Sequence, residues 1–202
     1  MARPLSVSAH EQVLDVALKL FAQRGIDATS MDAIAEVSGV SKATIYKHWR
    51  DKDALCLEVM ARLHGADEEP PLSGAGDVRD EIVAVLSRRS PEHRSEMQTR
   101  MMPHLMAYAA RNPAFGTAWR ARVMEPPRRQ LTELLKRAVE QGRLPADLDY
   151  DLALALLIGP KMYGYFMTLA GKLMPEDLPH RVVDSFWRAH AVTKEPKRNR
   201  RR

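Results

Sequence analysis

Apolar residues recur at intervals of three and four positions along most of this chain, and this spacing restricts its possible folds more than any other feature. Residues at such intervals line one face of an α-helix. Runs of β-branched and aromatic residues, which would predict strands, are scarce, and thirteen prolines and ten glycines separate the apolar segments. At 202 residues the chain is long enough to bury a sizeable core. We therefore expect an all-α protein of about nine helices.

The N-terminal part of the chain divides into four short helical segments. The first segment ends at Gly25 and the second at Gly39, because glycine readily adopts the conformation that stops a helix. Ser41 and Asp51 are suitable N-caps for the third and fourth segments. This arrangement predicts a compact bundle of short helices near the N-terminus.

The second and third segments match the pattern of a helix-turn-helix. In this motif two short helices meet at a tight turn, so that the second can enter the major groove of DNA. Gly39 would supply the turn, with Ile34 and Val40 packed beneath it, while Ile45 and Trp49 lie four positions apart on the inward face. A glycine that only separates two core helices, beside solvated lysines, would give a similar local pattern.

The outward face of the third segment has the chemistry of a DNA-contacting surface. Residues 40–52 contain four basic residues and one acid, a local charge of +3. The whole chain carries +5, but residues 194–202 hold six basic residues and one glutamate and account for that excess. Lysine, threonine, tyrosine and histidine can contact base edges or phosphates, small residues allow a close approach, and helix N-termini offer N–H groups to phosphates. The candidate DNA-binding residues are Thr29, Ser30, Ser41, Lys42, Ala43, Thr44, Tyr46, Lys47, His48 and Lys52.

Residues 17–25, 29–40, 41–49 (SKATIYKHW) and 52–55 together resemble the DNA-binding domain of the tetracycline-repressor (TetR/AcrR) family. The resemblance covers roughly residues 8 to 60 in the order and spacing of the segments, and Trp49 stands where the family usually has phenylalanine. A weaker similarity to one type of C-terminal domain of this family covers residues 131–142, 147–151 and 156–163.

The resemblance implies a ligand-responsive transcriptional regulator, usually a repressor, although activation stays open at this point. Members of the family are all-helical homodimers whose C-terminal domain binds a small molecule. A two-fold dimer would place its recognition helices about 34–36 Å apart, or a multiple of that, and would read a palindromic operator. A small molecule would release the DNA by favouring a spacing that does not match the operator.

The expected domains follow from the same pattern. Residues 1–52 would form the helix-turn-helix DNA-binding domain, residues 53–193 a helical ligand-binding and dimerisation domain, and residues 194–202 a basic, disordered tail that could add attraction to phosphates. The stretch 65–76 is rich in glycine, proline and acidic residues and would be a linker or an inter-helix loop.

The last two helical segments are unusually apolar for surface elements. The first contains Leu152, Leu156 and Phe166, and the second contains Phe186 and Trp187. Helices that are apolar all round are buried, either in the core of their own domain or in an interface between subunits. The resemblance favours the interface, so we expect a homodimer through the last two helices.

A pocket for a small hydrophobic inducer is expected in the C-terminal domain. Methionine adapts to apolar ligands of varied shape, and several of the eleven methionines lie there beside aromatic residues. The same spacing is typical of an ordinary core, and His104 and Tyr163 are candidate polar groups. The candidate ligand-binding residues are Met101, Leu105, Tyr108, Trp119, Met124, Met162, Tyr163 and Phe166.

Other classes of protein receive little support. No serine-histidine-aspartate pattern, phosphate loop or apolar carboxylate pair predicts an enzyme, and we expect no cofactor. Cys56 is the single cysteine, and the seven histidines never recur at metal-ligand spacing, so no metal site is expected. The longest apolar run, 152–159, is too short to span a bilayer and no signal peptide is evident, so we expect a cytoplasmic protein without a membrane partner. A helical interaction module would be expected to carry a basic amphipathic helix, whereas the small residues beside this basic patch suit a DNA groove better.

Overall fold

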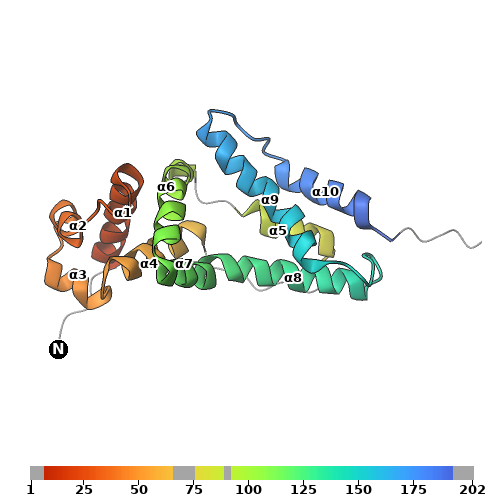
Figure 1. Cartoon of the computed structure of the whole chain (residues 1–202), viewed down its shortest axis with the longest axis horizontal. Coiled ribbons are helices and arrows are strands. Elements are labelled where there is room, and N and C mark those ends of the chain that lie inside the picture. Colours follow the sequence, from red (N-terminus) through yellow and green to blue (C-terminus); the bar gives the residue numbers. More distant parts are fainter. Residues whose placement is uncertain (1–6, 66–75, 89–91, 193–202) are drawn as a thin grey trace, which may run out of the picture. The chain divides into compact units, whose positions relative to one another are not determined.

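The computed structural model describes residues 7–65, 76–88 and 92–192, and these residues form helices and no strand. The helices make nine separate stretches within the described ranges, because α7 (Pro113–Trp119), the π-helical segment η1 (Arg120–Met124) and α8 (Glu125–Glu140) follow one another without a break (Figure 1). The all-α prediction is confirmed. The predicted tail and most of the predicted linker lie outside the described residues.

The chain divides into two compact units. The first unit comprises residues 1–71 and 89–127, and the second comprises residues 72–88 and 128–202. The predicted domain boundary after residue 52 falls inside the first unit, because α4 (Lys52–His64) and α6 (Glu92–Arg111) both pack on α1 (Val7–Arg24). The division between the units falls within α8, after Pro127.

The first unit is built around α1. This helix contacts α2 (Met31–Ser38), α4 and α6, and α2 in turn contacts α3 (Lys42–His48) (Figure 1). The shared apolar core includes Phe21, Ile34, Trp49, Leu55 and Leu105. Burial of such side chains from several helices stabilises the arrangement by the hydrophobic effect, so the short helices α2 and α3 need little intrinsic helical stability.

Side-chain oxygens cap the N-termini of the short helices, at Ser41 and Asp51 as predicted and also at Ser30. The hydroxyl of Ser30 accepts a hydrogen bond from the N–H of Ala33 (3.1 Å), and the hydroxyl of Ser41 accepts one from the N–H of Thr44 (3.2 Å). The carboxylate of Asp51 accepts a 2.7 Å hydrogen bond from the N–H of residue 54 at the start of α4. Each bond satisfies a backbone donor that the helix itself leaves without a partner.

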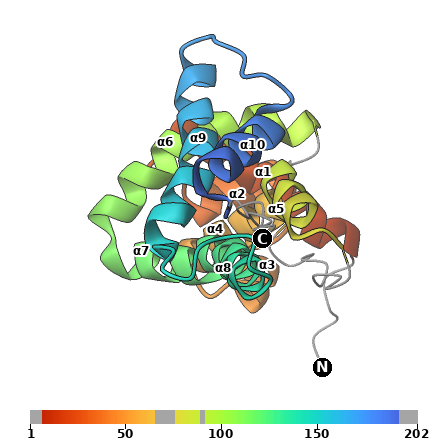
Figure 2. The same ribbon diagram turned by 90° about the vertical axis from the view of Figure 1, so that its right-hand side faces the viewer.

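The second unit contains α5 (Val78–Ser87), α9 (Tyr150–Leu169), α10 (Leu178–His190) and most of α8. α10 lies beside α9 and also contacts α5 (Figure 1, Figure 2). Val183, Phe186 and Trp187 of α10 are buried in the core of this unit. A part-buried ion pair joins Arg137 of α8 to Glu81 of α5 at 2.6 Å.

The two adjacent prolines at the start of α8 do not break the helix. Prolines inside a helix commonly kink or break it, but here the chain stays helical through Pro126 and Pro127 and takes a π-helical turn in the five residues before α8. Proline has no N–H, so the carbonyls four residues earlier, of Arg122 and Val123, lose their α-helical partner. The π-helical turn, which is rare and occurs mostly as a single turn within an α-helix, lies directly before this interruption of the hydrogen-bond ladder.

Candidate DNA-binding surface

The turn between α2 and α3 is set by Gly39. Its backbone φ is 66°, in the left-handed region where a side chain would be strained. Beside it, the buried hydroxyl of Ser38 donates to the carbonyl of Ala35 (3.3 Å) and accepts from the N–H of Val40 (3.3 Å). One glycine and one buried serine therefore fix the angle at which α3 leaves α2.

The inward face of α3 is buried as predicted. Ile45 is fully buried, and Trp49, directly after the last residue of α3, is only 2% exposed. Both side chains belong to the core that also contains Ile34. Their burial decides which face of this short helix is left toward solvent.

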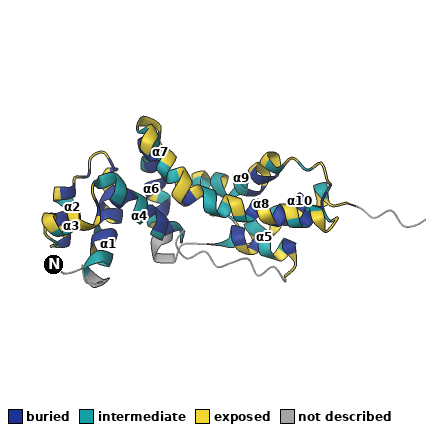
Figure 3. Ribbon diagram, turned by 90° about the horizontal axis from the view of Figure 1, so that it is seen from below, coloured by how far each residue is buried: buried dark blue, intermediate teal, exposed yellow. Residues whose placement is uncertain are grey.

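The opposite face of α3 is exposed over the whole length of the helix (Figure 3). Tyr46 is 49% exposed, and Thr44 is half-buried. The other exposed residues of this face are Lys42, Ala43, Lys47 and His48. A short helix with two lysines on its outer face and an N-terminus flanked by small residues has the size and charge that the major groove accepts.

Three candidate residues at the start of α3 already have partners. Ser41 and Thr44 share a 2.7 Å hydrogen bond between their hydroxyls. Lys42 forms an ion pair with Asp32 of α2, and both side chains are more than half exposed. Exposed pairs contribute little net free energy, so Lys42 can exchange Asp32 for a phosphate group at small cost. Ser30, the N-cap of α2, is exposed.

Thr29 and Lys52 are turned into the protein, which argues against the side-chain contacts with DNA that we expected. Thr29 is 1% exposed, and its hydroxyl donates to the carbonyl of Gly25 at 2.8 Å. The ammonium group of Lys52 donates to the carbonyls of Ile26 (2.6 Å) and Asp27 (3.3 Å). Both residues hold the loop between α1 and α2, because each donates to backbone carbonyls of that loop.

Two residues that the sequence did not single out contact the end of α3. Oε2 of Glu58, on α4, accepts a 2.6 Å hydrogen bond from the indole Nε1 of Trp49. Oε1 of the same carboxylate lies 2.7 Å from Nε2 of His10, on α1. The His10 ring also lies over the Trp49 ring, with the centroids 4.8 Å apart. Glu58 is 9 positions from Trp49 and 48 positions from His10 in the sequence, so no local pattern could have predicted these contacts.

Further polar contacts connect α6 to the helix-turn-helix. The hydroxyl of Tyr108 donates to Oδ1 of Asp53 at 2.6 Å, and Arg111 forms an ion pair with Asp27. Burial and this hydrogen bond raise the pKa of Tyr108 above its usual value. His104 packs over Gly25, where a Cβ atom would lie 3.2 Å from its Nδ1. The imidazole of His104, a candidate polar group of the ligand pocket, therefore fills the space above Gly25.

The candidate ligand residues of the first unit are mostly core. Met101, Leu105 and Tyr108 are buried in the main cluster of this unit, and the hydroxyl of Tyr108 already has a partner. Trp119 is half-buried against the same cluster, and its buried indole N–H makes no hydrogen bond with the described residues. Met124 is exposed. Trp119 is therefore the member of this group with an unsatisfied donor.

The remaining ligand candidates belong to the second unit. Tyr163 and Phe166 of α9 are 56% and 52% exposed, and Met162 is half-buried. The structure therefore does not gather the eight candidates within one unit.

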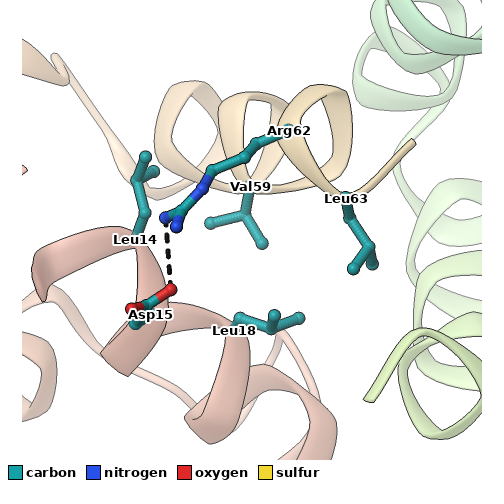
Figure 4. Close-up of a pocket in the computed structure, with 6 residues that line it drawn as sticks. All are labelled: Leu14, Asp15, Leu18, Val59, Arg62 and Leu63. Atoms are coloured by element: carbon teal, nitrogen blue, oxygen red, sulfur yellow. Dashed lines mark ion pairs between the residues drawn. The ribbon is translucent and has the colours of Figure 1, made fainter. Parts of the chain in front are cut away.

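A small open depression lies between α1 and α4 (Figure 4). Its lining includes Leu14, Leu18 and Val59, and Arg62 reaches across it to pair with Asp15 at 3.2 Å. It encloses about 200 Å³, part of it open solvent, which is below the usual volume of a small-molecule pocket. None of the predicted ligand residues lines it. Within the described ranges, no group of three or more histidine, cysteine or acidic side chains is placed to hold a metal ion.

One face of α9 is apolar and exposed. Leu152, Leu156, Tyr163 and Phe166 are each roughly half exposed, and their spacing of four, seven and three residues places them on one side of the helix. By length and composition alone, α9 could also cross a membrane. Core helices of soluble proteins meet the same two criteria. The buried side of α9 packs on α10 and α5. Apart from Leu169 at its last position, the large exposed apolar side chains of this helix therefore lie on its outer face.

Comparison with known proteins agrees with both parts of the chain. Residues 13–59 match the model of bacterial regulatory proteins of the tetR family, and residues 72–186 match that of a tetracyclin repressor-like C-terminal domain. The uncharacterised helix-turn-helix-type transcriptional regulator YdeS of Bacillus subtilis is 30% identical over 166 residues, covering 82% of each chain. The DNA-binding transcriptional repressor TetR of Mycobacteroides abscessus is 27% identical over 161 residues, covering 80% of this chain and 83% of that protein.

Solved structures share the fold. A crystal structure described as a TetR-family transcriptional regulator from a Rhodococcus species matches with a TM-score of 0.73 at 19% identity, covering 89% of this chain and 99% of that one. The flavonoid-responsive regulator FrrA matches with a TM-score of 0.64 at 23% identity, covering 92% and 98%. At this level of identity the similarity establishes the architecture of the chain.

Proposed function

The chain belongs to the tetracycline-repressor (TetR) family of bacterial regulatory proteins, and on that premise we propose that it is a transcriptional repressor that binds a palindromic operator as a homodimer and is released by a small hydrophobic molecule. Regulators of this family bind DNA and small ligands and function as dimers. The observation that carries the proposal is the basic face that α3 leaves toward solvent, because Ile45 on its inner face and Trp49 directly after its last residue are buried. A cytoplasmic location follows from this role.

The proposed DNA contacts come from α3 and from the N-termini beside it. Tyr46 and Lys47 lie in the middle of the exposed face and would reach base edges or phosphates, with Lys42, Thr44 and His48 on either side. The backbone at the start of α3, next to Ser41 and Ala43, would approach a phosphate closely because no large side chain intervenes. The exposed hydroxyl of Ser30 would approach a phosphate from the start of α2.

The proposed homodimer uses the outer face of α9. We expected both of the last two helices to form the interface, but Phe186 and Trp187 of α10 are buried within a single chain. The half-exposed row from Leu152 to Phe166 on α9 is left to pair with the same row of a second copy. Such self-pairing is isologous and gives the two-fold symmetry that a palindromic operator requires.

The proposed inducer is small and largely apolar. Trp119 favours a ligand with a hydrogen-bond acceptor, because its buried N–H lacks a partner among the described residues. Binding would release the operator only if the ligand prefers the conformation that does not fit DNA.

Selection of bound duplexes from a random DNA pool tests the proposed function. We expect the selected sequences to contain a palindrome with half-site centres one or two helical turns apart. Placing that sequence over a promoter should lower expression of a reporter gene when the protein is present. Recovery of no common sequence, or of a single half-site without symmetry, would contradict the proposal.

A further inference from the structure

The carboxylate of Glu58 connects three helices of the first unit. It accepts the hydrogen bond of the Trp49 indole (2.6 Å) and lies 2.7 Å from the imidazole of His10. Glu58 is on α4, His10 on α1, and Trp49 follows the last residue of α3. The His10 and Trp49 rings also contact each other in a tilted arrangement, with their centroids 4.8 Å apart, so each of the three side chains contacts the other two.

The buried indole of Trp49 depends on this carboxylate. Trp49 is 2% exposed, and a buried N–H without an acceptor loses the hydrogen bond that it would make with water. The acceptor is charged, which makes the hydrogen bond shorter and stronger than a neutral one. Glu58 itself is half-buried, and the two donors compensate for its reduced contact with water.

The recognition helix has few other anchors. α3 contains seven residues, and Ile45 is its one buried side chain. An apolar contact such as that of Ile45 holds the helix against the core but is not directional. The hydrogen bond from the indole of Trp49 to Glu58 is directional. The backbone N–H of Trp49 donates to the carbonyl of Ile45 at 3.0 Å. A displacement of the indole would therefore displace the C-terminal end of α3.

We propose that Glu58 is a positioning residue for sequence-specific recognition, acting through Trp49 to hold α3 in register with the base edges. This inference rests on the proposed function. Base readout depends on the placement of a few side chains, whereas attraction to phosphates tolerates displacement. Loss of the contact therefore lowers the affinity for the operator and leaves the affinity for unrelated DNA unchanged or higher.

The charge of Glu58 makes the test discriminating. Removing an acid near a DNA-binding surface should by itself strengthen binding, because one repulsive charge is lost. Loss of the positioning contact should weaken operator binding, so the two effects have opposite signs. Glu58→Gln removes the charge but keeps an acceptor for Trp49 and a donor for a neutral His10. Glu36→Ala removes the charge of an exposed glutamate on α2 and is the matched control.

The experiment compares these variants on the selected operator and on an unrelated duplex. For Glu58→Ala we expect about tenfold weaker operator binding, with binding to the unrelated duplex no weaker than in the wild-type protein. Glu58→Gln and Glu36→Ala should bind the operator at least as well as the wild type. In the background of Trp49→Phe, which lacks the N–H, Glu58→Ala should cause less than half of its usual loss, because the two residues act as one unit.

A spectroscopic reading separates this role from general loss of stability. The three tryptophans give three indole N–H signals in a nitrogen-proton correlation spectrum of the free protein, and Trp49→Phe identifies one of them. Glu58→Ala should move that signal and leave those of Trp119 and Trp187 in place. If the wild type selects no operator, the proposed function fails. If the wild type binds its operator, two results for Glu58→Ala would refute the positioning role. One is an unchanged affinity for the operator, and the other is an equal loss of affinity for the operator and for the unrelated duplex.

Discussion

The hydroxyl of Tyr108, on α6, donates a 2.6 Å hydrogen bond to Oδ1 of Asp53, on α4. The same aromatic ring lies under the ammonium group of Lys52, which is 5.8 Å from its centroid. Lys52 in turn holds the carbonyl of Ile26 in the loop before α2. These contacts explain why α6, which lies far along the chain, belongs to the same compact unit as the helix-turn-helix.

Removing the hydroxyl of Tyr108 should weaken the first unit. For Tyr108→Phe we expect the free energy of unfolding to fall by about 1 kcal/mol, because Asp53 loses its donor. The raised pKa of Tyr108 means that the folded protein keeps the phenolic proton at a pH where the unfolded chain loses it. Its contribution is therefore complete below about pH 10, the usual tyrosine value, and is lost as the pH rises through the folded pKa.

Urea unfolding of the wild type and of Tyr108→Phe at about pH 8 and about pH 10.5 checks this prediction. The difference in stability between the two proteins should shrink at the higher pH. An equal difference at both values would show that the phenolic proton is not held in the folded state.

Substitution of Lys47 and of Lys52 by alanine should affect different properties, the first DNA binding and the second stability. Lys47→Ala should weaken operator binding by about tenfold and reduce the slope of log K against log salt by about one, because an exposed cation on α3 is lost. Lys52→Ala should leave that slope unchanged and lower the thermal midpoint instead, because its ammonium group binds carbonyls of the α1–α2 loop. Fluorescence anisotropy across a salt series, beside thermal unfolding, separates the two. A reduced slope of log K against log salt in Lys52→Ala would show that Lys52 contacts DNA.

A charge on the outer face of α9 should dissociate the proposed homodimer. Tyr163 lies in the exposed apolar row, whereas Thr168 is exposed on the opposite side of the same helix. Tyr163→Lys should give a monomer at micromolar concentration in sedimentation velocity, because an unpaired ammonium group would be buried in the interface. Thr168→Lys should remain dimeric. A dimeric Tyr163→Lys protein would assign the interface to another surface.

The thiol of Cys56 should be unreactive in the folded protein. Cys56 is buried in the core of the first unit, and burial, together with the nearby charge of Asp53, raises the pKa of its thiol. Labelling by a disulfide reagent should therefore be slow in buffer and should accelerate with urea in parallel with unfolding. Complete labelling within seconds in buffer would show that α4 opens locally.

The sequence was sufficient to predict the helix-turn-helix because its determinants are local. Gly39, Ser41 and Asp51 act on backbone groups within a few residues, and the pairing of Ile45 with Trp49 follows from helical spacing. Helical spacing also decides that one face of α3 is buried. It could not show that Thr29 is buried, because the loop before α2 has no periodic pattern.

The helical spacing of apolar residues could not predict contacts between segments that are distant in the sequence. The side chain of Lys52 could have pointed to DNA or to the loop, and only the packed structure shows the carbonyls of Ile26 and Asp27 as its partners. Phe186 and Phe166 are equally apolar, so the sequence could not decide that the chain buries Phe186 by itself and leaves Phe166 half exposed. For the same reason core methionines such as Met101 were indistinguishable from pocket residues.

Photo-cross-linking from two aromatic positions tests the central claim most directly. A benzophenone side chain replaces the exposed ring of Tyr46 on α3 or of Tyr163 on α9, and each protein is irradiated on the selected operator. The account predicts that position 46 cross-links to DNA at the same base position in both half-sites, and that position 163 cross-links to a second protein chain. Cross-links to DNA from position 163, or none from position 46 on a bound operator, would contradict it.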